Sequence, residues 1–392
     1  MGDISLTASD ILVLWNGWSF EGISGGDRHL LDMISGWSVI GDSPVQVILP
    51  ELGRQVISSY LPIMSPYVLR YGLDKKILSN TLDLVIAYIW RIVESSFVNL
   101  SHPPRILISS SHLPYDVWPA VILSRRYKAK LVVYIYHLIQ EQNRAWSLRN
   151  SISVISEQLS LLLIKKYADL VITDNQIVSA QLNKMGLAPD RMFDSHLGVS
   201  LKNIQSAVGQ PHDHQVVVLG RLTRNKGVFD LPDIWARITS ALPDSKLLII
   251  GDGPERNNLT ECFKAAGLSG NVEFAGFIEE QNKYSILKGS KVLLAPSREE
   301  GWGIAVCEAM ACGLPVVAYD LPAYHSVFRQ GILTVSIGDK AGLADHVVKL
   351  LKDEELRQET GRAAYQQSLE YDVTVIAQQQ WSWLQELFSS KD

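Results

Sequence analysis

Two glutamates lie on either side of a glycine-containing turn in the second half of the chain. In the stretch APSREEGWGIAVCEAMACGLPVVA, Glu300 precedes the turn and Glu308 lies eight positions later, within a run of helix-forming composition. Carboxylates accept paired hydrogen bonds from neighbouring hydroxyls, such as those of a sugar or a ribose. The pattern therefore favours two points of contact with a hydroxyl-rich ligand; the alternative is a pair of solvated glutamates.

The turn between these glutamates is suited to an anion. An apolar run ends at Pro296, Gly301 and Gly303 flank Trp302, and the helical run begins at about Ile304. In open α/β sheets, ligands bind in the crevice at the carboxyl ends of the strands. Unpaired N–H groups at a helix start attract negative charge, and glycines let it approach the backbone. We therefore expect a phosphate at this turn.

Basic residues follow another predicted strand. Gly220 and Arg221 come directly after the apolar run Val216–Leu219, and Lys226 precedes the next helical stretch. Two cations at a strand end can neutralise a diphosphate and stabilise it as a leaving group. Arg224, between them, is expected to be solvated, and a fully solvated loop is the alternative for all three cations.

These segments together resemble glycosyltransferase family 4. Glu300 and Glu308 match its E-x7-E signature, AMACGLPVVA is typical of it, and GRLTRNKG is similar to its phosphate-binding segment. Ile250–Pro254 resembles its GxGP turn, and the likeness spans about Gln215–Phe388. The resemblance implies the α/β GT-B fold, in which two Rossmann-like domains with parallel sheets face each other across a deep cleft.

The resemblance also implies roles for individual residues. The implied catalytic residues are Arg221, Lys226, Glu300 and His137. The implied donor-binding residues are Gly25, Gly26, Gly220, Phe277, Ile278, Gly301, Trp302, Gly303, Ile304 and Glu308. Of these, Phe277 and Ile278 are expected to contact a nucleobase through their backbone, so their side chains do not indicate which base is bound.

The N-terminal half resembles the family less. Gly25 and Gly26 precede a predicted helix without forming a GxGxxG motif, and they resemble the family's loop near the donor phosphates; an ordinary turn is the alternative. His137 follows a predicted strand and resembles a histidine near the donor sugar. His112 and Arg28 are candidate acceptor contacts. A lone histidine is more often a structural residue, and that alternative remains for both.

One segment departs from the family pattern. Where the first domain ends, the family often has Asn-Gly-Val-Asp, and this chain has Leu197, Gly198, Val199 and Ser200. These side chains cannot make the same polar contacts at the connection between the domains.

Short β-branched runs alternate with helical stretches along the chain, which predicts βαβ units and parallel sheets covered on both faces. The predicted strands are Ile11–Trp15, Val45–Leu49, Ile106–Ser109, Leu131–Tyr136, Leu170–Thr173, Val216–Leu219, Lys246–Ile250, Val272–Ala275, Val292–Ala295 and Pro315–Ala318. The polar stretch Gly198–Gln215 divides the strands into two series, which favours two open sheets over a TIM barrel. We predict an acceptor domain over residues 1–200, a donor domain over 201–372, and a helix over 373–392 that returns to the first domain.

Composition restricts the class of protein. The chain has 392 residues, a net charge of −5 and three cysteines without a CxxC pair, which argues against nucleic-acid binding, a disulfide framework and a zinc site. No signal peptide is apparent, and the longest apolar runs, such as Leu159–Ile164, are too short to span a bilayer. We expect a cytoplasmic protein. The basic run Arg125–Lys130 is expected to be solvated, with peripheral contact to anionic lipid at the inner face of the cytoplasmic membrane as the alternative.

The function implied is that of a retaining hexosyltransferase that needs no metal or cofactor. The expected donor is a UDP-sugar such as UDP-glucose, with GDP-mannose next, and the expected acceptor is a glycan or a lipid-linked molecule. Two alternatives stay open: a nucleotide-sugar epimerase on the same fold, and a non-catalytic subunit that binds a nucleotide sugar.

Overall fold

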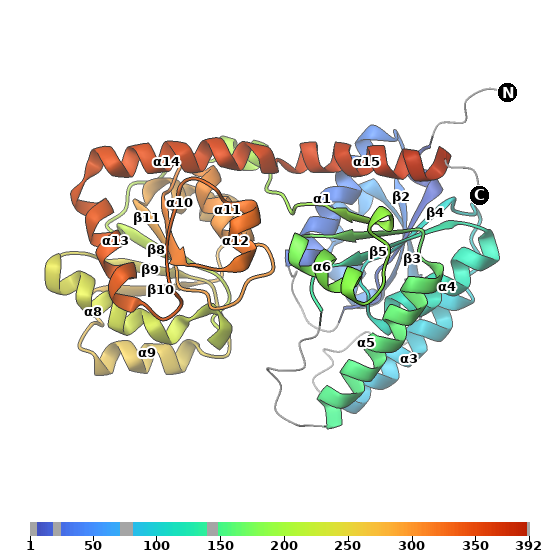
Figure 1. Cartoon of the computed structure of the whole chain (residues 1–392), viewed down its shortest axis with the longest axis horizontal. Helices are drawn as coiled ribbons and strands as arrows, with labels where there is room; N and C mark the ends of the chain where they lie inside the picture. Colours follow the sequence, from blue (N-terminus) through green and yellow to red (C-terminus); the bar gives the residue numbers. More distant parts are fainter. Residues whose placement is uncertain (1–5, 19–24, 71–80, 139–147, 390–392) are drawn as a thin grey trace. The chain divides into compact units, whose positions relative to one another are not determined.

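The computed structural model describes residues 6–18, 25–70, 81–138 and 148–389 (Figure 1). The chain divides into two compact units. Unit 1 comprises Met1–His196 and Thr374–Asp392, and unit 2 comprises Leu197–Val373. The boundaries expected from the sequence are 200/201 and 372/373.

Unit 1 is built on a parallel sheet of seven strands in the order β3-β2-β1-β4-β5-β6-β7. Its strands are β1 (Ile11–Leu14), β2 (Val45–Pro50), β3 (Met64–Leu69), β4 (Ile106–Ser109), β5 (Lys130–Ile135), β6 (Leu170–Thr173) and β7 (Met192–Asp194). The register places Leu12 beside Gln46 on one side and Leu107 on the other. The central strands are buried on both faces because helices cover the sheet, which explains their continuous apolar sequences.

Seven helices of unit 1 lie within the described residues. They are α1 (Gly25–Ile40), α2 (Glu51–Val56), α3 (Thr81–Ser96), α4 (Pro114–Tyr127), α5 (Leu148–Tyr167), α6 (Gln176–Lys184) and α15 (Val373–Ser389), of which α15 begins at the last residue of unit 2. Helix α4 contacts both α3 and α5, and the three lie side by side in Figure 1. Val117, Ala120 and Leu123 of α4 are buried in the core of the unit.

Helix α15 is fixed to unit 1 by a buried amide. Tyr134 Oη donates to Gln380 Oε1 (2.5 Å), and Gln380 Nε2 donates to Ser195 Oγ (2.6 Å). The ring of His29 lies 3.3 Å from the same Nε2 and accepts from it, because burial lowers the pKa of His29 to about 3 and keeps the ring neutral. The Gln380 amide is thus satisfied inside an otherwise apolar environment.

Unit 2 repeats this architecture with six parallel strands in the order β10-β9-β8-β11-β12-β13. They are β8 (Val216–Leu219), β9 (Leu247–Ile250), β10 (Val272–Gly276), β11 (Val292–Ala295), β12 (Val316–Tyr319) and β13 (Ile332–Val335). Its helices are α7 (Leu201–Ser206), α8 (Leu231–Ala241), α9 (Arg256–Ala265), α10 (Glu280–Gly289), α11 (Ile304–Ala311), α12 (Pro322–Val327), α13 (Lys340–Lys352) and α14 (Glu354–Ser368). Leu231, Trp235 and Val347 are among the buried residues of its core.

The predicted α/β fold class, with two Rossmann-like domains built on parallel sheets, is confirmed. Three strands were missed, namely β3, β7 and β13. These are edge strands whose residues are mostly half-buried or exposed, so they lack the continuous apolar run by which the others were found, and β3 also contains Pro66. The composition of Asp74–Val98 also predicts a helix; its first residues lie outside the described range, and the helix is observed over Thr81–Ser96.

The segment that departs from the family pattern has its own contacts within unit 2. Val199 N donates to Tyr371 O (2.9 Å), and Val199 O accepts from Val373 N (3.1 Å). Ser200 caps α7, since its Oγ accepts from Asn203 N (3.3 Å). Backbone pairing and a helix cap therefore stabilise this segment without the polar side chains that the family pattern has there.

None of the helices in the described part of the chain combines the length and the apolar composition needed to cross a membrane.

Candidate active site

A pocket lies in unit 2 at the carboxyl ends of β8 and β11. These neighbouring strands mark the point where the strand order of the sheet reverses, which is where open α/β sheets bind ligands. Polar lining comes from Gly220, Arg221, Lys226, Ser297 and Glu300. The loops after β8 and β11 thus bring together residues that are about 80 positions apart in the chain, as the strand order of the sheet requires.

Close backbone contact holds the two loops together. Gly227 has φ +65°, and a Cβ at this position would lie 1.8 Å from Pro296 O, so only glycine fits. Arg298 N donates to Asn225 O (2.8 Å), which ties the turn Arg224–Lys226 to the residues after β11. Lys226 is therefore fixed beside the second loop by backbone geometry.

This arrangement places an ion pair between the loop after β8 and the loop after β11. Lys226 Nζ lies 2.6 Å from Glu300 Oε2, and Ser297 Oγ donates to Glu300 Oε1 (2.8 Å). Arg221 is exposed beside them and makes no side-chain hydrogen bond or ion pair within the described residues. The pocket therefore contains an oriented carboxylate, a paired ammonium and a guanidinium that is available to an anion.

The turn after Glu300 leads directly into the N-terminus of α11. Gly303 adopts φ +105° and precedes α11, whose N-terminus has no side-chain cap. A Cβ at Gly303 would lie 2.9 Å from the Tyr324 ring, so a larger residue would force a shift. Gly301 is exposed and Ile304, the first residue of α11, is half-buried. The first-turn N–H groups of α11 are thus open to an anionic ligand.

Trp302 is a structural residue of this turn. Its side chain is 2% exposed, and its ring lies 5.4 Å from that of Phe328 and 5.2 Å from that of Tyr371. The indole anchors the turn in the core of unit 2, so a contribution of Trp302 to donor binding would come from its backbone.

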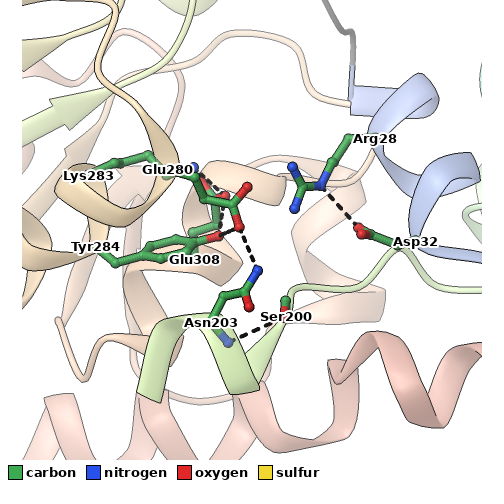
Figure 2. A network of polar contacts seen from close by, with 8 residues as sticks. All are labelled: Arg28, Asp32, Ser200, Asn203, Glu280, Lys283, Tyr284 and Glu308. Carbon is green, nitrogen blue, oxygen red and sulfur yellow. Dashed lines mark hydrogen bonds and ion pairs between the residues drawn. The ribbon is translucent and has the colours of Figure 1, made fainter. Parts of the chain in front are cut away.

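Glu308 belongs to a second polar network (Figure 2). Its Oε1 accepts from Lys283 Nζ (2.5 Å) and from Tyr284 Oη (3.2 Å), both on α10. Tyr284 Oη also lies 3.2 Å from Glu280 Oε1, which accepts from Asn203 Nδ2 (3.2 Å). Sequence reasoning missed Lys283 and Tyr284, because they are 24 or more positions from Glu308 and belong to no local motif.

The predicted nucleobase contacts lie after β10. Phe277 is 85% exposed and Ile278 is half-buried. A side chain as exposed as that of Phe277 is not part of the core, which leaves both its ring and its backbone accessible.

In unit 1, Gly25 and Gly26 are the first residues of α1. A Cβ at Gly26 would lie 3.2 Å from the Tyr136 ring, so the site has little room for a side chain. Arg28 Nε donates to Asp32 Oδ2 (3.4 Å), one helical turn later in α1 (Figure 2).

The two candidate histidines of unit 1 have different environments. His112 is 4% exposed, and its Nε2 lies 2.7 Å from Glu157 Oε1, a partner that the sequence did not suggest. His137 is exposed, and its ring lies edge-on to that of His112 at 6.3 Å. Glu157 thus occupies the Nε2 atom of the buried His112, whereas the ring of His137 is exposed.

Among the residues that the structure describes, no three His, Cys, Asp or Glu side chains are grouped in a way that could hold a metal ion.

Known proteins are similar to this chain in sequence and in fold. Residues 202–367 match the family model described as "Glycosyl transferases group 1". A phosphatidyl-myo-inositol mannosyltransferase of Mycobacterium leprae is 35% identical over 190 residues, 46% of this chain and 50% of that protein. An N-acetyl-alpha-D-glucosaminyl L-malate synthase of Bacillus anthracis is 32% identical over 151 residues, 38% of this chain and 39% of that protein. The chain thus spans about half the length or less of these curated relatives.

Similarity of fold extends over nearly the whole chain. The crystal structure of Anabaena HepE in complex with UDP and glucose matches with a TM-score of 0.74 and 17% identity, and covers 96% of this chain and 99% of that one.

The two Rossmann-like units built on parallel sheets match the GT-B fold of such solved structures. The match to the glycosyl transferases group 1 lies within unit 2, and the resemblance to family 4 that the motifs indicate is consistent with these relatives.

Proposed function

We propose that the protein transfers a hexose from a nucleotide sugar to a glycan or lipid-linked acceptor, with retention of anomeric configuration and without a metal ion. The observation that carries this proposal is the Lys226–Glu300 pair beside Arg221, at the reversal point of the unit 2 sheet. A pocket with cations, an oriented carboxylate and open helix amides suits a ligand that is a diphosphate at one part and a sugar at another.

Each group of the pocket has a defined task in this reaction. The bond between the anomeric carbon and the β-phosphate oxygen breaks, and the acceptor oxygen bonds to that carbon on the same face. The departing phosphate oxygen takes the acceptor proton. Arg221, Lys226 and the first amides of α11 stabilise the charge that develops on the diphosphate. Glu300 accepts hydrogen bonds from hydroxyls of the donor sugar.

Glu308 is proposed to hold the ribose of the donor. Lys283 and Tyr284 occupy its Oε1, which orients the carboxylate and leaves Oε2 for ribose hydroxyls. The donor we favour is a UDP-sugar such as UDP-glucose, followed by GDP-mannose. HepE was solved with UDP and glucose, and the names of the two curated relatives specify mannosyl and N-acetylglucosaminyl transfer, so both donor types belong in the test.

The test is a thermal-unfolding panel of UDP-, GDP- and ADP-sugars. A donor that binds the folded protein raises Tm by mass action. We expect one nucleotide series to raise Tm, the rise to vanish in Glu308→Ala, and the matched control Glu299→Ala, an exposed neighbour of the site, to keep it. No rise with any nucleotide sugar would contradict the donor assignment.

Product analysis separates the proposed reaction from its rivals. A glycosyltransferase releases the free nucleoside diphosphate, and NMR of the product gives its anomeric configuration, which we expect to match the donor. An epimerase would instead yield an altered sugar nucleotide. A non-catalytic subunit would bind the donor without turnover in the presence of any acceptor extract.

A further inference from the structure

Helix α3 of unit 1 exposes an apolar face. Val85, Ile89, Val93 and Phe97 recur every four residues along one side of α3 and just past its end, and Trp90 lies beside them. These five side chains are between 43 and 73% exposed. A surface helix normally turns charged or polar residues to water, so an apolar outer face on α3 requires an explanation.

Exposed apolar side chains also lie on the neighbouring helices α4 and α5. Ile122 of α4 and Ile155, Leu159 and Leu162 of α5 are 46–64% exposed, and α4 contacts both α3 and α5. The apolar patch, meaning these four residues and the five of α3, holds nine of the eighteen exposed large apolar side chains among the described residues. Concentrations of this kind mark surfaces that bind a partner or a membrane.

A group of cations borders the patch at the C-terminal ends of the three helices. Arg126 Nη2 donates to Asn99 Oδ1 (2.5 Å), just beyond α3, and the Arg125 guanidinium lies 5.4 Å from the Tyr167 ring at the end of α5. Lys128, Lys165 and Lys166 are exposed at the same ends. The cationic rim, meaning these five residues, therefore borders all three helices that bear the patch.

The charge of the cationic rim indicates which kind of surface binds the apolar patch. The chain carries a net charge of −5, so a rim of five cations is a local departure from its overall sign. In a symmetric dimer formed through this patch, the same surface of each copy would face the other, so the two cationic rims would approach and repel each other. An anionic lipid surface attracts each Lys or Arg close to it, and it also offers an apolar layer for the exposed side chains.

We propose that the patch and rim dock unit 1 on an anionic lipid surface. Trp90 and Phe97 enter the interfacial region, where aromatic side chains are favoured, and the lysine and arginine side chains extend to the lipid phosphates. Such contact is peripheral: the helices lie on the surface without crossing it. The inference rests on the surface of unit 1 alone and does not depend on the donor or the reaction proposed for unit 2.

Cosedimentation of the full chain with vesicles tests this proposal. We expect binding to phosphatidylcholine vesicles that contain about one-third phosphatidylglycerol, little binding to pure phosphatidylcholine, and weaker binding as salt rises. Lys165→Gln with Lys166→Gln should lower the partition coefficient by about 5-fold per cation. Ile89→Ser with Phe97→Ser should lower it at least as much, since both side chains are exposed and their loss does not affect the core.

Two controls match these variants. Lys202→Gln with Lys264→Gln removes the same charge from exposed positions of unit 2, and Val39→Ser removes an equally exposed apolar side chain of unit 1 outside the patch. Both should bind vesicles as the unchanged chain does. The Tm rise with a nucleotide sugar should be the same in all variants, so failure of the lipid proposal and failure of the proposed reaction give different results.

Three outcomes would overturn the proposal. The first is no binding to anionic vesicles at low salt. The second is binding that the patch and rim variants reduce no more than the controls do. The third is a dimer in solution that Ile89→Ser with Phe97→Ser converts to a monomer, which would identify the patch as an interface between two copies of the chain.

Discussion

The two units have the same strand order around their central strands, yet they use the reversal point of the sheet differently. In unit 2 the loops after β8 and β11 present Arg221, Lys226 and Glu300 to a pocket. In unit 1 the corresponding loops, after β1 and β4, are tied together by buried polar residues. Asn16 N donates to Asp116 Oδ1 (2.7 Å), and both residues are fully buried.

This difference shows that the fold supplies a location and the loops decide its use. Asp116 accepts hydrogen bonds from Ser110 and Ser111 as well as from Asn16, which stabilises the loops against each other. The pocket of unit 2 instead keeps its charges accessible to a ligand. Changes at the reversal point should therefore affect catalysis in unit 2 and stability in unit 1, and the predictions below test this contrast.

The largest effect is expected from Lys226→Ala. Loss of a cation that stabilises the leaving diphosphate should lower kcat by about 100-fold or more. We expect a much smaller change in Tm, because Glu300 keeps its hydrogen bond from Ser297 when the Lys226 ammonium is removed. Steady-state kinetics with the preferred donor measures this. Arg224→Ala, two residues away and paired with Glu255, is the matched control and should keep nearly full activity. A comparable loss in both variants would mean that the loop, and not the Lys226 ammonium, is responsible.

In contrast to Lys226→Ala, Gln380→Ala should reduce stability and leave donor binding unchanged. It leaves the partners of a buried amide unsatisfied, at a cost of about 2 kcal/mol in the free energy of unfolding of unit 1. Urea unfolding measures the loss, and donor affinity should stay unchanged. Gln379→Ala, the exposed neighbour on α15, should be neutral. Equal stability of the two variants would refute the anchoring role of Gln380.

Lys283→Met tests whether orientation of Glu308 matters to donor binding. Without the ammonium, the carboxylate is less well held, and KM for the donor should rise by about tenfold while kcat changes little. A donor that lacks the ribose 2′ hydroxyl should bind the unchanged chain more weakly, and this penalty should shrink in Lys283→Met. An undiminished penalty would show that Lys283 does not act through Glu308.

Asp116 should make the stability of unit 1 depend on pH. Burial raises the pKa of Asp116 from 3.8 to about 7, so the folded protein retains a proton that the unfolded chain releases. The stabilisation is fully present below about pH 4 and is lost as the pH rises to about 7. Between about pH 5 and 7.5, the Tm of Asp116→Asn should fall less than that of the unchanged chain, by about 5–10 °C. Asp83→Asn, at an exposed position of the same unit, should behave as the unchanged chain does.

The smallest effect is expected from Phe277→Ser. If the nucleobase is held by the backbone of Phe277 and Ile278, loss of an exposed ring should raise KM for the donor by less than about 3-fold. A larger rise, seen with one nucleotide series and not with another, would assign a base-stacking role to the ring.

Much of unit 2 was predictable because its signals are local. Glu300, the glycine turn and Glu308 lie within nine positions, and the strands on either side are buried apolar runs. The partners that complete the site were not predictable. Lys283 pairs with Glu308 across two helices, and Glu157 pairs with His112 across 45 positions, so no spacing rule connects them. Burial of Trp302 was also missed, since a tryptophan in a glycine-rich turn gives no indication of which way its side chain points.

The sequence by itself determined the class of fold, because alternating apolar runs and helical stretches can bury their surfaces only as sheets covered by helices. It also indicated the residues that we propose to bind a nucleotide sugar, since their types and spacing are set within single loops. The tertiary structure decided which of those residues meet. Strand order placed the loops of β8 and β11 together, and the fit of Gly227 against Pro296 brought Lys226 to Glu300. Such contacts depend on packing between segments about 70 residues apart, and a local sequence pattern carries no information about that packing.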